Sequence, residues 1–171
     1  MNQGLSQNIW INVIGFQVTW WLSIMYGNSA IVPVVFLLAL HLVFHKAAVE
    51  EIAVITACAC IGFTVDIMLT MQGVFIFENN PAHVPCWLFL LWLCFSATLR
   101  QSLRFFSHHL ALASIAGAIA GSLTYLAAAR LGAVSFGFST FSTFSLLALV
   151  WAILFPLLLL ISTNIRKMYA Y

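Results

Sequence analysis

Asp66 is the residue of this chain whose type and position most clearly allow chemistry. It lies within a long apolar run, ITACACIGFTVDIMLTMQGVFIF, from Ile55 to Phe77. A carboxylate inside the hydrocarbon of a bilayer costs about 2.5–3.5 kcal/mol on insertion scales, so such a group is usually paired, neutralised or functional. Asp66 could relay protons, bind a polar group of a substrate, or act as an acid or base. The alternative is a structural carboxylate satisfied by Tyr125 or Arg130.

Small and polar side chains lie on the same helix face as Asp66. Gly62, Thr70 and Gly73 surround it at spacings of three and four residues. Residues at these spacings share one face of an α-helix. We expect this face to point into a bundle of helices.

Two other apolar segments contain polar residues that are predicted to lie inside the membrane, as Asp66 is. Gln17 and Trp21 lie one helical turn apart in the first segment, and Tyr125 lies in the fifth. Together with Asp66, these residues are candidates to line a polar substrate-binding cavity. The alternative for Gln17 is an interhelical hydrogen bond, because buried amides need partners and polar side chains join membrane helices in this way.

A second group of polar residues is expected at the opposite, cytoplasmic membrane surface. In the segment HLVFHKAAVEE, His41 and His45 stand four residues apart, and Glu50 and Glu51 follow. These ligand types and this spacing would allow His41, His45 and Glu51 to bind a metal. The spacing resembles the His-x-x-x-His elements of membrane di-iron hydroxylases, but the five histidines of this chain are too few for that pattern. The alternative is a set of interfacial side chains that pair with arginines and water, and no cofactor is predicted.

Two arginines are candidates for binding an anion. Ser96, Arg100 and Arg104 repeat every four residues, which places two guanidinium groups and a hydroxyl along one side of a helix. Because the arginine fork matches the oxygens of a phosphate, this side could bind an anion or a lipid phosphate. The alternative is an ion pair between Arg100 and Glu50 or Glu51.

Composition excludes a water-soluble fold. Charged residues make up 6% of the 171 positions, against about 25% in a soluble domain. The hydrophobic fraction is 64% and the mean hydropathy is +1.08. The net charge of +2 is too small and too scattered for nucleic-acid binding. We therefore expect membrane lipids as partners, with a homo-oligomer or another membrane protein as a further option.

The apolar segments predict an all-α polytopic bundle of six helices that forms one transmembrane domain over residues 1–171, since about 20 helical residues cross the hydrocarbon. The expected spans are Asn8–Tyr26, Ala30–His45, Ile52–Ile76, Pro85–Phe105, Leu110–Ala129 and Phe144–Thr163. Most lysines and arginines between and after these spans fall on one side: Lys46, Arg104, Arg166 and Lys167. Only Arg130 clearly falls on the other side, so the positive-inside rule predicts that both termini are cytoplasmic.

Other local patterns predict how the helices pack and connect. Ala113, Gly117 and Gly121 form a stripe of small residues that allows close helix approach, either inside the bundle or in a dimer. The segment Gly132–Ser142 reads as an interfacial loop or as a re-entrant, gating segment. Pro156 is expected to kink the sixth span.

Several short motifs resemble an uncharacterised family of bacterial inner-membrane proteins, catalogued as a domain of unknown function. They are FQVTWW at Phe16–Trp21, GVFIF at Gly73–Phe77, P-x-W at Pro85–Trp87, LLWLCFSATL at Leu90–Leu99 and RLGAV at Arg130–Val134. The resemblance implies a six-helix protein of the bacterial inner membrane, and an association with enzymes that modify fatty-acyl phospholipids. It favours these positions as functional: Glu51, Asp66, Trp92, Thr98 and Ser102.

Three functions remain open on the sequence. The first is a protein that handles a lipid or a small hydrophobic substrate, as a carrier or as an accessory to a lipid-modifying pathway. In this case Asp66 and Gln17 form the polar interior site, and Arg100 and Arg104 meet anionic head groups. The second is a small intramembrane enzyme that uses Asp66 or the histidine and glutamate group. The third is a structural membrane subunit.

Overall fold

The computed structural model describes residues 8–45, 47–77 and 84–169. Lys46, on which part of the orientation prediction rests, lies outside them. The chain is all-α apart from two short strands. The helices are α1 (Ile9–Tyr26), α2 (Ile31–Val43), α3 (Ala48–Met71), α4 (Cys86–Ser96), α5 (Leu110–Ala116), α6 (Ser122–Arg130) and α7 (Thr140–Tyr169). A π-helical segment, Gly117–Gly121, joins α5 to α6, so that Leu110–Arg130 is one continuous helix.

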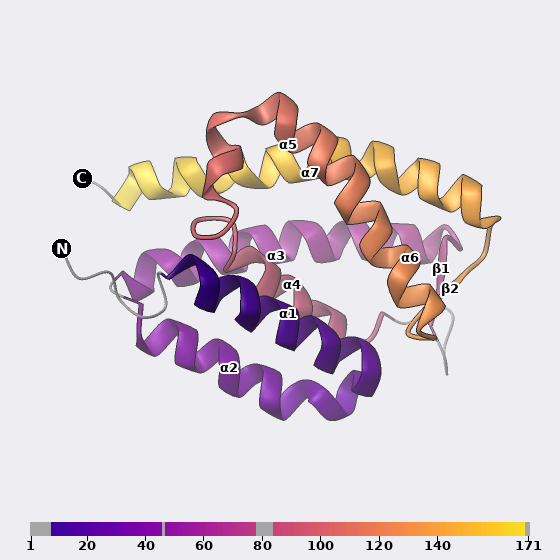
Figure 1. The fold of residues 1–171 in the computed structure, drawn as a ribbon, viewed down its shortest axis with the longest axis horizontal. Helices are drawn as coiled ribbons and strands as arrows, with labels where there is room; N and C mark the ends of the chain where they lie inside the picture. Colours follow the sequence, from indigo (N-terminus) through magenta and orange to yellow (C-terminus); the bar gives the residue numbers. More distant parts are fainter. Residues whose placement is uncertain (1–7, 46, 78–83, 170–171) are drawn as a thin grey trace.

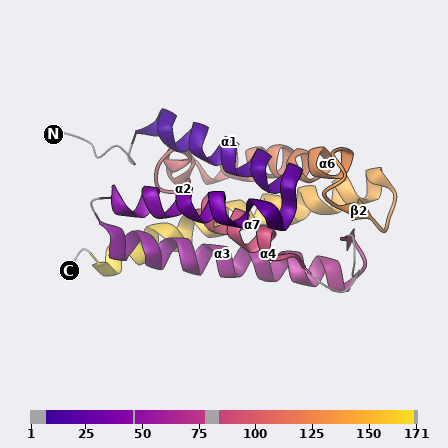
Figure 2. The ribbon, with the colours of Figure 1, turned by 90° about the horizontal axis from the view of Figure 1, so that it is seen from below.

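The helical segments run back and forth between the two ends of the bundle, and the continuous helix formed by α5 and α6 crosses the others obliquely (Figure 1). The start of α1 and the end of α7 lie at the same end of the bundle, on the left in Figure 1, and the two strands lie at the other end. Viewed from below, α1 and α2 form an antiparallel hairpin above α3 (Figure 2). This hairpin turns through a 3-10 segment, Gly27–Ala30.

Within the described ranges, four helical segments are long and apolar enough to cross a membrane. They are Ile9–Val43, which includes both α1 and α2, then Ala48–Met71, Leu110–Arg130 and Thr140–Tyr169. At 24 residues, α3 is about 36 Å long at 1.5 Å per residue, more than the roughly 30 Å of hydrocarbon. The chain is therefore a multi-pass membrane protein.

The fourth expected span is the one that differs most from the structure. The α-helix there covers only the 11 residues of α4, where the sequence predicted a helix to Phe105. After Ser96 the chain continues in turns, and the 3-10 helix Arg104–His108 follows. The Thr98 hydroxyl donates to the Phe95 carbonyl oxygen at 2.6 Å, a local side-chain bond of the kind that competes with regular helix.

Small residues allow the close contacts inside the bundle. A methyl group added to Gly117 would lie 2.6 Å from the Trp151 carbonyl oxygen and 2.9 Å from Cβ of Phe155, and one added to Gly121 would overlap the Trp151 indole. The stripe of small residues therefore packs against α7, as the prediction of close packing inside the bundle requires. The helix α7 itself continues through Pro156.

The two connections at the far end of the bundle pair as a small sheet that the sequence did not predict. Strand β1 (Phe75–Ile76) runs antiparallel to β2 (Ser135–Phe136), with Phe75 opposite Phe136. The turns before both strands contain a glycine at positive φ, Gly73 at +73° and Gly132 at +82°, a conformation that only glycine adopts readily. The third helix consequently ends at Met71, five residues before the expected boundary.

Candidate functional site

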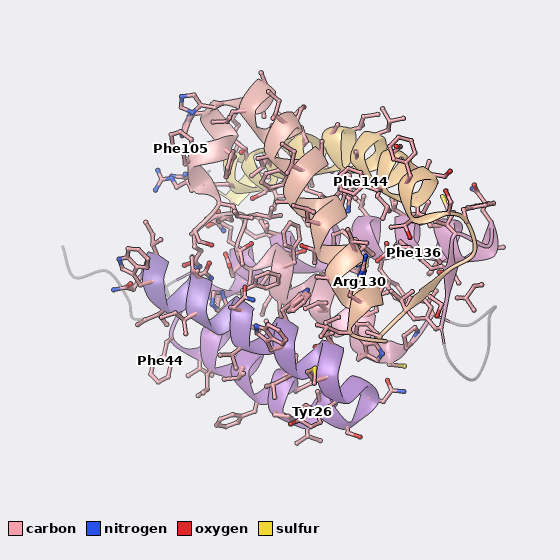
Figure 3. The ribbon with its side chains drawn as sticks, turned by 45° about the vertical axis from the view of Figure 1, so that its right-hand side comes forward. Tyr26, Phe44, Phe105, Arg130, Phe136 and Phe144 are labelled. Carbon is pink, nitrogen blue, oxygen red and sulfur yellow. The ribbon has the colours of Figure 1, made fainter. Side chains whose placement is uncertain are left out.

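Asp66 is buried in α3 with an exposed fraction of 1% and is held by side chains from two other helices. The Trp92 indole Nε1 of α4 donates to Oδ2 at 2.7 Å, and the Tyr125 hydroxyl of α6 lies 2.8 Å from both carboxylate oxygens. Of the two partners expected from the sequence, Tyr125 is the one found. Arg130 is exposed at the end of α6 (Figure 3).

Trp92 reaches Asp66 because Gly62 leaves space for its indole. A methyl group at Gly62 would overlap the six-membered ring of Trp92, and Gly62 lies one turn before Asp66 on the same face of α3. The sequence prediction placed this face in the bundle, and Gly62, Asp66 and Thr70 are buried there, whereas Gly73 is exposed in the turn that follows. Trp92 as a partner was missed. The sequence signal for it was the glycine one turn from a buried carboxylate.

Gln17 and Trp21, the candidates from the first segment, do not contact Asp66. Both are exposed, and the Trp21 ring lies edge-on against Trp20 with a centroid distance of 5.2 Å. The interhelical bonds of α1 are made by Asn12 instead. Its Nδ2 donates to the Ala97 carbonyl oxygen at 3.2 Å, and its Oδ1 accepts a 2.6 Å bond from the Ser102 hydroxyl.

A groove lies between α1 and the helix Leu110–Arg130. It consists of two cavities of about 70 Å³ and about 340 Å³ that share four lining residues: Phe16, Phe95, Thr124 and Trp151. We call these two neighbouring cavities together the lateral groove. Trp92 and Tyr125 line the smaller part and Gln17 lines the larger part. Asp66 therefore lies behind the groove wall, where it fixes two of the aromatic residues that form it.

At the opposite end of α3, Glu51 is the centre of a polar cluster. Its exposed fraction is 1%. The Nε2 atoms of His41 and His45 lie 3.1 and 3.5 Å from its two carboxylate oxygens, and Arg100 and Gln101 donate to it at 3.3 and 3.4 Å.

Arg100 also forms an ion pair with Glu50 at 2.8 Å, which confirms the pairing that the sequence offered as the alternative to an anion site.

His45 lies in the link between α2 and α3, outside both helices. Its backbone contact shows which ring nitrogen carries the proton of the neutral side chain. The backbone N–H of Ala47 donates to its Nδ1 at 3.2 Å. Since this nitrogen accepts, the neutral ring carries its proton on Nε2, which faces Glu51. Burial lowers the pKa of His45 below its usual value near 6.5, and His41 and Arg100 lower it further, while Glu51 opposes them.

The structure does not bring the predicted metal ligands His41, His45 and Glu51 together as a metal-binding group. Among the described residues, no group of three or more His, Cys, Asp or Glu side chains could hold a metal ion. The physical reason is that each histidine directs its Nε2 at a different oxygen of Glu51, while the Arg100 guanidinium lies 3.3 Å from one of them.

Arg104 lies outside the Glu51 cluster and lines a cavity beside it. A cavity of about 450 Å³ opens beside the Glu51 cluster and is lined by three arginines, Arg100, Arg104 and Arg166. We call it the basic cavity. His108 also lines it, while both His108 and His109 are exposed and apart from His41.

In Figure 3, Phe44 and Phe105 lie at the end of the bundle that holds the basic cavity, and Phe136 lies at the end that holds the two strands.

Comparisons with curated proteins and with solved structures give no match. The family model described as a protein of unknown function (DUF2878) matches residues 9–157. The matched range contains Asp66, its two donors, the Glu51 cluster and the whole lateral groove. The chain therefore belongs to this family of unknown function, as the short motifs indicated.

Proposed function

We propose that this chain is a protein of the bacterial inner membrane that binds a lipid or another hydrophobic amphiphile, as a carrier or as an accessory to a lipid-modifying pathway. The observation that carries the proposal is the lateral groove. It comprises two neighbouring cavities that share three aromatic lining residues, Phe16, Phe95 and Trp151, and it lies between two membrane-length helical segments. Membrane lipids are then its partners.

The arrangement of the helices supports a six-crossing topology with both termini in the cytoplasm. Successive helices reverse direction along the bundle (Figure 1). Arg104 and Arg166 belong to the end of the bundle where α1 starts, and Arg130, the last residue of α6, lies at the other end. This distribution agrees with the positive-inside rule. In this topology residues 1–171 form a single transmembrane domain.

The walls of the lateral groove suit an acyl chain. Phe16, Phe95 and Trp151 present aromatic surface, and the small side chain of Ala120 leaves space on the helix Leu110–Arg130. Thr124, shared by both parts of the groove, is exposed. The medium outside is hydrocarbon in the proposed topology, so an acyl chain can enter from the side.

Asp66 has a positioning role in this proposal. It touches the groove only through Trp92 and Tyr125, whose donor groups it accepts. Loss of its carboxylate would free both aromatic side chains to change rotamer. The substrate would then meet a differently shaped wall, without ever contacting Asp66.

Native mass spectrometry of the purified protein tests whether the groove retains a lipid. Ala120 and Ala111 both lie on the helix Leu110–Arg130 and are both exposed, but only Ala120 lines the groove. Ala120→Phe fills the groove and is expected to lower the fraction of protein that keeps one bound phospholipid at least fivefold. The matched variant Ala111→Phe is expected to leave this fraction unchanged.

Equal lipid retention by Ala120→Phe, Ala111→Phe and the unchanged protein would contradict the proposal. A melting temperature of each variant, measured in the same detergent, shows that the comparison is made between folded proteins.

A further inference from the structure

We infer that the basic cavity binds the phosphate group of the amphiphile whose apolar part occupies the lateral groove. The inference rests on the proposed function for the link between the two spaces. The cavity itself stands on its own residues, and its volume of about 450 Å³ is that of an ordinary small-molecule site.

The charges in the basic cavity are unbalanced. Arg100 is neutralised, because Glu50 and Glu51 lie 2.8 and 3.3 Å from its guanidinium nitrogens. Arg104 and Arg166 have no acidic partner within residues 8–45, 47–77 and 84–169. Two guanidinium groups from separate segments, the 3-10 helix Arg104–His108 and the last turn of α7, therefore line one space without a counter-ion.

An unpartnered buried group gives this cavity a second polar feature. Gln101 lines it with an exposed fraction of 8%, and its Nε2 donates to Glu51 at 3.4 Å. Its Oε1 has no hydrogen-bond partner among the described residues. A buried carbonyl oxygen without a donor is costly, and a hydroxyl or ammonium group next to the bound phosphate would supply one. The chemistry that matches both features is a phosphodiester with a hydrogen-bond donor beside it.

The first helix connects the basic cavity to the lateral groove. Ile9 lines the basic cavity and Val13 lines the groove. These residues are four positions apart, so they lie on one face of α1 about 6 Å from each other along the helix axis. A single amphiphile can therefore place its head group near Arg104 and Arg166 and its chain along α1.

Binding of two lysophospholipids with the same acyl chain tests the inference. The purified full chain in a neutral detergent is titrated with lysophosphatidylglycerol, whose head group is anionic and carries hydroxyl donors, and with lysophosphatidylcholine, whose zwitterionic head group has no hydrogen-bond donor. We expect at least tenfold tighter binding of lysophosphatidylglycerol. The double variant Arg104→Gln/Arg166→Gln should lose this preference, and Lys167→Gln, an exposed neighbour that does not line the cavity, should keep it.

Competition on the unchanged protein keeps the test decisive if the double variant does not fold. Inorganic phosphate should displace lysophosphatidylglycerol at an ionic strength at which chloride does not. An equal effect of both salts, or tenfold preference retained in a folded double variant, would overturn the inference.

A chain-free probe separates this inference from the proposed function. If glycerol 1-phosphate binds as tightly as lysophosphatidylglycerol, the phosphate site stands and the acyl groove is contradicted. If Ala120→Phe weakens both lysophospholipids while neither the double variant nor phosphate affects them, the groove stands and the phosphate site is overturned.

Discussion

At the scale of single residues, the carboxylate of Asp66 joins three helices at one point. It belongs to α3 and accepts from Trp92 of α4 and Tyr125 of α6. Around it, Trp92 stacks on Trp151 with a centroid distance of 5.6 Å, and Tyr125 stacks on Phe75 at 5.0 Å. A polar group that would otherwise be costly in a membrane thus orders an aromatic wall, because its hydrogen bonds fix the rings that the groove needs.

Trp92→Phe should destabilise the protein by about 1–3 kcal/mol, because it leaves a buried carboxylate oxygen short of a donor. Trp10→Phe is the matched control, since Trp10 is 74% exposed and is expected to change stability by less than about 0.5 kcal/mol. Denaturant unfolding in detergent, followed by circular dichroism, measures both. Equal stability of the two variants would mean that the bond to Asp66 contributes nothing.

The lowered pKa of His45 predicts how the free energy of unfolding changes with pH. Because its pKa is lowered in the folded protein, the unfolded chain takes up a proton more readily, and acidification favours unfolding. Stability should fall as the pH drops below about 6.5, and this contribution should level off once the pH is below the lowered folded value.

His45→Asn keeps an acceptor for the Ala47 N–H and removes the titration. The melting temperature of the unchanged protein should therefore fall more between pH 7.5 and pH 5 than that of His45→Asn. Glu51, His41 and Arg100, which face His45, are present in both proteins. If the melting temperatures of the two proteins changed with pH in parallel, His45 would not be the source of the loss of stability at low pH.

At the scale of helices and strands, small residues decide which elements approach closely. Gly121 lies against the Trp151 ring where the π-helical segment meets α7. Gly121→Ala must move α7 or the indole that lines the groove, and the expected cost is about 1–3 kcal/mol.

Gly15 in α1 is the matched control, since a methyl group there meets nothing within 4 Å. Gly15→Ala should be neutral or stabilise by about 0.5–1 kcal/mol, because alanine favours a helix interior. Thermal unfolding in the same detergent compares the two. A Gly121→Ala protein as stable as Gly15→Ala would show that the helices are not in close contact there.

The residues at which helices begin were more predictable than the residues at which they end. The starts of the first, second and fifth helices lie within one residue of expectation because apolar runs and turn residues define them. The end of α4 and the pairing of β1 with β2 were missed, because both depend on contacts between segments that are distant in the sequence. The Gly137 backbone N–H, for example, donates to the carbonyl oxygen of Val74 at 3.1 Å.

At the scale of the whole molecule, the polar residues divide into two regions at opposite ends of α3. The sequence predicted this division and offered Tyr125 as one of two possible partners of Asp66. It did not predict that Trp92 would complete the site, since that contact needs the space at Gly62. It also placed Gln17 beside Asp66, whereas Gln17 lies at the exposed side of the groove, because the rotation of α1 follows its packing on α2 and α4.

The first helix and the lateral groove connect the two ends of the bundle. The basic cavity at one end and the apolar groove toward the other suit the head group and the chain of an amphiphile. The basic cavity lies at the end predicted to be cytoplasmic, and the aromatic part of the groove lies toward the strands. A head group and an acyl chain would therefore have fixed places and a fixed orientation in the membrane.

Photo-crosslinking of an acyl chain tests this account most directly. The protein is placed in nanodiscs that contain phosphatidylglycerol with a diazirine in its acyl chain, and the crosslinked residues are identified by mass spectrometry. The account predicts adducts on Phe95 and Trp151, which line both parts of the groove, and their loss in Ala120→Phe. Adducts confined to outward-facing residues such as Ile119 and Ile153, and unchanged in Ala120→Phe, would contradict it.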